Sequence, residues 1–482
     1  MQQRADCALL LLMVLAPSAI FAQTFDVVIS NGRVMDPESN LNAVRNLGIR
    51  AGRIATISSS PLRGKSEIDA KGLVVAPGFI DLNEHGYDPA TFGLIARDGV
   101  TSAFELELGP RDGDLDNWYA ARADKSLLNY GAGIGYTFAR MQSMEGQFDV
   151  SGAAAYGEAT PSQLEKMSNI IERGLRRGAL GVGFGLQYVP GSSRSEVIEF
   201  FRLAAKYEAT CYVHLRYGSV KAPGSTLEAL EEVMAASMIS GARLHILHVG
   251  TSALSKGPEV LDASKSARAH GLSLTADAYP YGAAEASITT AIFDPGWQER
   301  LGITYKDLQW VTTGERLNQQ TFDQYRQSTG IGAMIIHLIP DDILRPTIID
   351  PTIMIASDGA LPTGSGGHPR EAGSFARILR VYVREQRVLS LMDAIRKMTV
   401  LPAQQLEARA PAMRNKGRLR AGADADITIF DPATVTDHAT YEHPDAPSTG
   451  IQYVLVRGVL VVKGGRVVGG VTPGRAVRAV VQ

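Results

Sequence analysis

The sequence predicts an α/β protein: a (β/α)8, TIM-like barrel plus a small β-sandwich formed from both chain ends. Between about residues 76 and 410, short apolar runs alternate with helix-like stretches, as expected for parallel β/α units. On both sides of that span, short alternating runs separated by Gly, Asn or Pro are typical of antiparallel hairpins. The chain of 482 residues is long enough to bury the core of a barrel and of an accessory domain.

The composition is that of an ordinary globular protein. The chain is 45% hydrophobic and 20% charged, and its formal net charge is −2. A nucleic-acid-binding protein would be expected to present a basic face, and this balance gives no indication of one. We therefore expect a small-molecule partner and no nucleic acid. The oligomeric state is not indicated by any pattern in the sequence.

The N-terminus resembles a secretory signal peptide, predicted to span residues 1–22. Arg4 precedes the apolar run 8–16, which is followed by Pro17 and the short segment 18–22, with a plausible cleavage point after Ala22. The run is too short to serve as a stable membrane anchor. We therefore expect a periplasmic or secreted protein. Once the signal is removed, Cys211 is the only cysteine, so an intramolecular disulfide is not possible.

The β-sandwich is predicted to consist of residues 23–75 and 411–482. The runs 25–29 and 47–50 in the first segment, and 453–456 in the second, have strand-like composition and lie between turn residues. Two β-rich ends that flank a long middle indicate one sheet structure assembled from both termini.

The barrel is predicted to span residues 76–410. Its strand-like apolar runs cover 73–80, 101–108, 179–186, 210–215, 243–249, 272–276 and 352–356. Its helix-like stretches include 162–177, 194–207 and 226–239. An irregular part around 284–345 is predicted to be an insertion over the mouth of the barrel.

Five of the predicted strands end in side chains typical of metal sites. These are Asn83 and His85 after the first strand, Glu105 and Glu107 on one face of the second, and His214, His248 and Asp358 after the fifth, sixth and eighth. The carboxyl ends of barrel strands meet at one rim, where catalytic residues are found. A lone strand histidine is more often a core residue, and we interpret five others in that way: His245, His270, His337, His438 and His443.

This set of side chains predicts a metal-dependent hydrolase. Imidazole and carboxylate groups suit zinc, and an incomplete ligand set leaves a place for water. Zinc would lower the pKa of that water and polarise a carbonyl group. Asp358 is the predicted catalytic residue, which would accept the proton of the water and pass it to the leaving nitrogen.

Short motifs along the chain carry a family resemblance. They are APGFID (76–81), DGVT (98–101), GLQYVPG (185–191), HLR (214–216), DAYPY (277–281), SDG (357–359), HPR (368–370) and KGRLRAGADAD (416–426). In this order they resemble the amidohydrolase superfamily, within the D-aminoacylase (N-acyl-D-amino-acid deacylase) branch. The likeness covers nearly all of the chain after the predicted signal peptide. It implies the same barrel and β-sandwich that the pattern predicts.

The resemblance also implies roles for individual residues. His85, His214, His248 and Asp358 match metal-site positions, and Asp358 is also the acid and base. The residue that bridges two metals is commonly Cys or carboxylated Lys in these families; here Glu107 is the best substitute and Glu105 the second. Tyr188, Tyr279 or Tyr281, and Arg370 match positions that hold the carboxylate and acyl group of the substrate. A guanidinium suits a carboxylate because it can donate two parallel hydrogen bonds.

Two departures from the family pattern change the expected site. Asn83 replaces the first His of a His-x-His pair, and an amide oxygen is a poor zinc ligand. The ion shared by His85 and Asp358 is therefore expected to be weakly bound or absent, and one tight Zn2+ is expected at Glu107, His214 and His248. Gly250 stands where the family has a Lys, which removes one contact to the carboxylate of the substrate.

The expected activity is hydrolysis of a linear, non-peptide amide C–N bond in a small carboxylate-bearing compound such as an N-acyl amino acid. One alternative is hydrolysis of a cyclic amide or an isopeptide, as in dihydroorotase, hydantoinase or isoaspartyl dipeptidase. A second alternative is a degenerate barrel that binds a ligand without turnover, which the Asn83 departure suggests.

Overall fold

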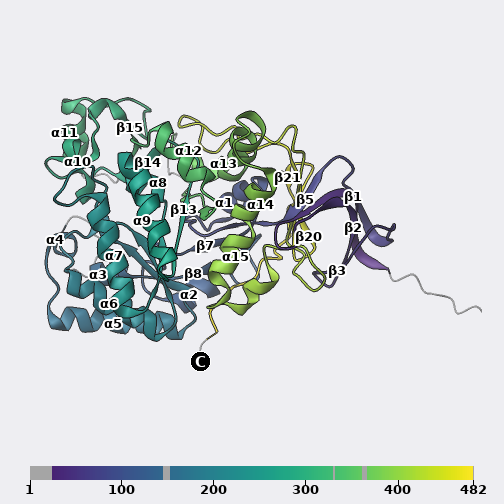
Figure 1. Cartoon of the computed structure of the whole chain (residues 1–482), viewed down its shortest axis with the longest axis horizontal. Coiled ribbons are helices and arrows are strands. Elements are labelled where there is room, and N and C mark those ends of the chain that lie inside the picture. Colours follow the sequence, from purple (N-terminus) through teal and green to yellow (C-terminus); the bar gives the residue numbers. More distant parts are fainter. Residues whose placement is uncertain (1–23, 145–151, 329–331, 361–365, 481–482) are drawn as a thin grey trace, which may run out of the picture.

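A barrel and a separate β-sheet lie side by side in the computed structural model (Figure 1). The structure describes residues 24–144, 152–328, 332–360 and 366–480. The predicted signal peptide lies outside these residues. Among the described helices, none is long and apolar enough to cross a membrane.

The barrel has eight parallel strand positions, as predicted. In order they are β6 (Phe79–Asp81), β7 (Val100–Glu105), β8 (Asn129–Ala132) with β9 (Ile134–Gly135), β10 (Gly181–Gly185), β11 (Thr210–His214), β12 (Arg243–Ile246), β13 (Leu274–Ala278) and β17 (Ile353–Ile355). β8 and β9 share the third position, because β8 pairs with β7 and β9 pairs with β10. The first and last positions are joined by a parallel bridge between Glu84 and Gly359.

Helices follow the strands and cover the outside of the barrel (Figure 1). They include α1 (Pro89–Arg97), α5 (Pro161–Arg176), α6 (Arg194–Lys206), α7 (Thr226–Ser240), α9 (Gly257–Ala269), α12 (Asp341–Ile349), α14 (Leu391–Met398) and α15 (Val400–Glu407). Local sequence explains where several of them begin. Thr160 and Gln163 form a capping box at α5, and Ser225 and Glu228 form one at α7.

Both ends of the chain form one nine-stranded sheet. Its strands are β1 (Phe25–Asp36), β2 (Leu41–Arg50), β3 (Arg53–Ser58), β4 (Gly64–Asp69), β5 (Val74–Pro77), β18 (Ile427–Phe430), β19 (Ile451–Val456), β20 (Val459–Lys463) and β21 (Arg466–Val467). The antiparallel pair of β5 and β18 joins the two ends. Side chains from both ends, including Ile49, Ile54, Ile427 and Leu455, share one hydrophobic core. The predicted fold class is therefore confirmed.

One predicted strand was wrong. The apolar run 73–80 was expected to be continuous, but β5 belongs to the end sheet and β6 to the barrel. Gly78 separates them, and its backbone N–H donates to the carbonyl oxygen of Asp426. A Cβ atom at Gly78 would lie only 2.2 Å from the Thr101 hydroxyl oxygen, so the chain crosses between the two sheets where only glycine fits.

The insertion has a sheet and a core of its own. β14 (Ala283–Ser287), β16 (Ala333–His337) and β15 (Leu308–Trp310) form an antiparallel sheet in that order. α10 (Trp297–Leu301) and α11 (Gln319–Gln327) lie beside it at one end of the barrel (Figure 1). Trp297 and Phe322 stack in a separate hydrophobic cluster. The sequence predicted this part to be irregular. Its three short strands pair only with one another and do not continue the β/α alternation of the barrel.

Candidate active site

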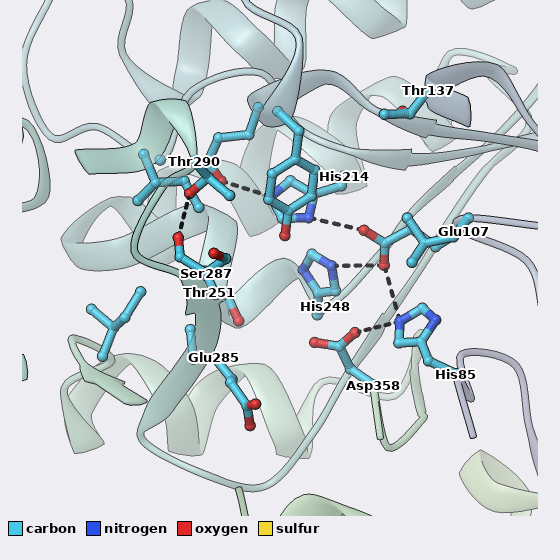
Figure 2. Close-up of a pocket in the computed structure, with 18 of the residues that line it drawn as sticks. His85, Glu107, Thr137, His214, His248, Thr251, Glu285, Ser287, Thr290 and Asp358 are labelled. Atoms are coloured by element: carbon cyan, nitrogen blue, oxygen red, sulfur yellow. Dashed lines mark hydrogen bonds and ion pairs between the residues drawn. The ribbon is translucent and has the colours of Figure 1, made fainter. Parts of the chain in front are cut away.

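The polar residues predicted at the strand ends meet at one rim of the barrel (Figure 2). His214 is the last residue of β11, and His248 follows β12 by two residues. Asp358 follows β17, and His85 follows β6. All of these strands are parallel, so their carboxyl ends face the same way and bring the side chains together.

The backbone is strained at two of these residues. The φ angles of His248 and Asp358 are 31° and 54°, in the left-handed region that residues other than glycine seldom adopt. The N–H of His248 donates to Asp277 Oδ1 at 2.5 Å, and Asp277 Oδ2 lies 2.8 Å from His245 Nε2. The buried Asp277 carboxylate therefore holds the turn that presents His248.

Glu107, His214 and His248 form the first group of candidate metal ligands. Glu107 Oε1 lies 3.1 Å from His214 Nδ1, and Glu107 Oε2 lies 3.4 Å from His248 Nε2. One ligand atom from each residue lies within 4.8 Å of the others, and all three residues are buried. Two imidazoles and one carboxylate that converge in this way fit zinc, with a further position left for water.

His85, Glu107 and Asp358 form a second candidate group, whose ligand atoms also lie within 4.8 Å of one another. His85 Nε2 lies 3.2 Å from Asp358 Oδ1 and 3.8 Å from Glu107 Oε2. Asn83 Nδ2 donates to Glu107 Oε2 and to Asp358 Oδ1, at 3.1 Å each. The N–H groups of the Asn83 amide therefore point at the two carboxylates that a second ion would need. The amide offers that ion no ligand atom in this orientation.

Glu105 lies beside the ligand groups and takes a different part from Glu107. Its Oε2 lies 2.8 Å from His85 Nδ1, and its Oε1 accepts hydrogen bonds from the N–H groups of Glu107 and Leu108. Glu105 therefore fixes the ring of His85 and the turn that carries Glu107. Both ligand groups contain Glu107 and neither contains Glu105.

Gln187 is a site residue that the sequence did not single out. Its Oε1 lies 2.6 Å from His214 Nε2, so the ring nitrogen turned away from Glu107 donates to this amide. Such a bond fixes the tautomer and orientation of a metal-binding histidine. The one indication of this residue in the sequence is its place in the GLQYVPG motif. It was not chosen as a site residue because an amide side chain is not a typical metal ligand.

Charges inside the site shift several pKa values. Burial opposes ionisation of Glu107, but hydrogen bonds from His214 and His248 outweigh it and hold its pKa well below the usual range. Burial likewise opposes ionisation of Asp358, but the Arg370 guanidinium and His248 lower its pKa. Burial lowers the pKa of His214. For His248, the charges of Asp358 and Glu107 outweigh burial and raise the pKa to about 9. The carboxylates are thus ionised and attract positive charge.

A cavity of about 370 Å³ opens over the ligand groups, a volume in the range of small-molecule sites. The predicted substrate-binding residues Tyr188, Tyr279 and Arg370 line it, and part of its wall is apolar and comes from the insertion. Arg370 Nη1 lies 2.6 Å from Asp358 Oδ2, and its guanidinium lies 4.9 Å from the centre of the Tyr279 ring.

Tyr281, the alternative to Tyr279, lies behind the cavity wall. Its hydroxyl donates to the carbonyl oxygen of Pro369 at 3.3 Å, and its ring lies under the guanidinium of Arg377. His368 supports the same loop: its Nε2 donates to the Ala283 carbonyl at 2.9 Å, and its Nδ1 accepts from the N–H of Arg370 at 3.1 Å. These contacts set the position of Arg370 in the cavity.

Curated relatives match almost the whole chain. An N-acyl-D-glutamate deacylase of Alcaligenes xylosoxydans xylosoxydans is 30% identical over 489 residues, which cover 91% of this chain and 94% of the relative. A D-aminoacylase of the same organism is 28% identical, covering 91% and 94%. A model of the amidohydrolase family matches residues 342–468.

Solved structures agree with these matches. An N-acyl-D-glutamate deacylase from Bordetella bronchiseptica, complexed with zinc and a phosphonate inhibitor, has a TM-score of 0.79 at 26% identity and covers 95% of this chain and 100% of that structure. A crystal structure of D-aminoacylase also has a TM-score of 0.79, at 24% identity, covering 94% and 100%, which supports the shared fold.

The barrel, the converging imidazole and carboxylate ligands and the cavity above them fit a metal-dependent hydrolase. The matching family and relatives show that it acts on carbon–nitrogen bonds other than peptide bonds. The chain belongs to the amidohydrolase family, within the branch of the N-acyl-D-amino-acid deacylases. The resemblance stated from the motifs is confirmed.

Proposed function

We propose that this protein is a zinc-dependent deacylase that hydrolyses the amide bond of N-acyl-D-amino acids. The observation that carries the proposal is the convergence of Glu107, His214 and His248 beside Asp358, in a cavity that also contains Arg370. The names of the deacylases that match this chain over nearly its whole length support the substrate class.

Asp358 is the proposed general base and acid. Its lowered pKa keeps it ionised at neutral pH, so it can accept a proton from the attacking water. The protonated carboxyl can then donate to the leaving nitrogen. Zinc held by Glu107, His214 and His248 would lower the pKa of the attacking water and polarise the carbonyl group.

Arg370 is the proposed binder of the substrate carboxylate. One of its nitrogens pairs with Asp358, while its Nε has no hydrogen-bond partner among the described residues. A buried guanidinium donor without a partner costs free energy, which a bound carboxylate would recover. Tyr279 supports the guanidinium from one side, and Tyr188 lies against His214 with a distance of 4.9 Å between ring centres.

We further propose that one ion is bound tightly. The group of Glu107, His214 and His248 offers two imidazoles, whereas the second group shares Glu107 and contains one imidazole. In addition, the Asn83 amide already satisfies one oxygen each of Glu107 and Asp358.

The test is hydrolysis by zinc-reconstituted protein of a panel of N-acyl-D- and N-acyl-L-amino acids, dipeptides, hydantoin and dihydroorotate. Release of amine from the N-acyl-D-amino acids is expected. Asp358→Asn should lower kcat by about 10²- to 10⁴-fold. Asp323→Asn, the same change at an exposed position of α11 outside the cavity, is the matched control and should retain activity. Ring opening of the cyclic amides alone would favour the cyclic-amide alternative, and tight zinc without any turnover would favour a ligand-binding barrel.

We also propose that the protein is exported, on the basis of Arg4, the apolar run 8–16 and the short segment up to Ala22 that follows it. N-terminal sequencing of the protein from a periplasmic or culture fraction should begin close to residue 23. Recovery of the intact chain from the cytosolic fraction alone would contradict export.

A further inference from the structure

Three charged residues line the cavity outside the two ligand groups: Arg111, Glu285 and Arg370. Arg111 is exposed and lies over the Phe138 ring, and Arg370 is paired with Asp358. Glu285 differs from both. It lies on β14 of the insertion, half-buried in the cavity wall, on the side of Ser287 and Thr251 and apart from the histidine cluster (Figure 2).

The carboxylate of Glu285 has no cationic partner. Among the described residues, no Lys, Arg or His nitrogen forms an ion pair with it, and the backbone N–H of His368 is its hydrogen-bond donor. Its neighbours along the wall include Ala284, Ala286 and Ile336, which cannot solvate a charge. Burial raises the pKa of Glu285 even though the Arg370 charge opposes this shift. The charged carboxylate is therefore less stable here than in water, which a bound cation would reverse.

The surroundings leave room for a further group. Gly250 is buried, yet apart from its two chain neighbours and the backbone of its own helix no heavy atom lies within 4 Å of the position that a Cβ would occupy there. Thr251, the next residue, lines the cavity, and its hydroxyl lies 2.5 Å from the Tyr279 hydroxyl. The cavity of about 370 Å³ that Thr251, Tyr279 and Arg370 line is large enough for an extended substrate side chain.

We propose that Glu285 binds an ammonium or guanidinium group of the substrate, so that the enzyme prefers amides carrying a positive charge. This inference rests on the proposed deacylase function and specifies its substrate class. Arg370 binds the carboxylate, and Glu285 binds the cation of the same molecule. The two side chains are close enough to interact electrostatically. Two sources offer this chemistry: the basic side chain of an N-acyl amino acid, or the free amino terminus of a dipeptide.

The test compares kcat/KM of zinc-loaded enzyme for N-acetyl-D-lysine, N-acetyl-D-norleucine and N-acetyl-D-glutamate. Norleucine has the chain length of lysine without its charge. The lysine compound should be preferred over norleucine by about 10- to 100-fold, the range expected of a charge-assisted hydrogen bond. Glycyl-D-alanine and N-acetyl-D-alanine form a second pair, which differs in the free amino group. A preference confined to one pair identifies the source of the cation.

Glu285→Gln keeps the shape of the side chain and removes its charge. It should abolish the preference for the cationic member while leaving the neutral compound within about 2- to 3-fold of the wild-type value. Ser287→Ala, on the same strand and also lining the cavity, is the matched control and should retain the preference. Equal loss for all substrates, or a wild-type preference for the neutral or acidic compounds, would overturn the proposal.

Calorimetry separates this proposal from the proposed function. Free D-lysine should bind the zinc-loaded protein more tightly than D-norleucine, and Glu285→Gln should remove the difference. If no amide is hydrolysed but this difference is present, the deacylase proposal fails and the cation site stands. If amides are hydrolysed, lysine and norleucine bind equally and glycyl-D-alanine is not preferred over N-acetyl-D-alanine, the cation site fails and the deacylase proposal stands.

Discussion

The side-chain nitrogen of Asn83 lies 3.1 Å from Asp358 Oδ1, and the same nitrogen lies 3.1 Å from Glu107 Oε2. Asn83 therefore donates to both carboxylates that would hold a second ion together with His85. Rotating the amide by half a turn would direct its oxygen at the carboxylates, which is unfavourable unless a cation lies between them. This arrangement supports the proposal that one ion is bound tightly.

The first prediction concerns this residue. Asn83→His replaces the amide with a zinc ligand, so the second group gains a second imidazole. The zinc content measured by mass spectrometry after dialysis should rise from about one to about two ions per chain. Asn83→Ala removes the donors without adding a ligand and serves as the control. An unchanged zinc content in Asn83→His would contradict this account of the second group.

The second prediction concerns Gln187, which lies behind His214. Gln187→Leu removes the hydrogen-bond acceptor that fixes the ring, so the affinity for zinc should fall by about 10- to 100-fold. Competition with a chromophoric chelator measures this affinity directly. Gln187→Glu retains an acceptor oxygen and should stay much closer to the wild type. Equal affinities for the Leu variant and the wild type would show that the contact is dispensable.

The third prediction concerns Asp277. Asp277→Ala leaves His245 and the N–H of His248 without their buried acceptor, and urea denaturation should show a loss of about 3 kcal/mol in the free energy of unfolding. The affinity for zinc should fall as well, because the turn at His248 loses its anchor. Thr275→Val removes the hydroxyl that contacts His245 Nδ1, the Leu244 carbonyl and Gln405 Oε1, and leaves Asp277 in place. It should lower stability less and leave zinc binding unchanged.

The fourth prediction is a pH dependence of stability. Burial and the charge of Asp81 raise the pKa of Glu371 to about 8, and neither of its carboxylate oxygens has a hydrogen-bond partner among the described residues. The folded protein therefore keeps a proton that the unfolded chain releases at lower pH. The free energy of unfolding should fall as pH rises from the ordinary range of glutamate towards 8, and then level off.

The check is urea denaturation of zinc-loaded protein at several values between about pH 5 and pH 9, with Glu371→Gln as the comparison. The amide has no proton to release, so the variant should lose less stability across this interval. Parallel curves for the two proteins would mean that other groups cause the dependence.

Much of the site was predictable because its geometry follows from strand periodicity. The residues His214, His248 and Asp358 end apolar runs in a β/α series, and parallel strands bring such ends together. The choice between Glu105 and Glu107 could not be made in this way, because both lie on one face of the same run. It depends on the turn after β7, where the Glu105 carboxylate folds back to accept backbone N–H groups.

Other features depend on contacts between distant parts of the chain. The role of Asn83 as a donor requires Asp358, which is 275 residues away in the sequence. The division of the first apolar run at Gly78 depends on Thr101 and Asp426. Neither contact can be recognised from the sequence around these residues, because hydrophobic periodicity describes one helix or strand at a time.

That division at Gly78 has a consequence for how the molecule assembles. β5 takes its antiparallel partner from the far C-terminal region, and a single residue separates it from the first strand of the barrel. β1 pairs with the other edge of β5, and β7 sets the register of β6, so the N-terminal part of the chain fixes both strands before β18 adds the second partner of β5. A nascent chain shortened before β18 would carry nearly every active-site side chain and would leave one edge of β5 without its partner strand.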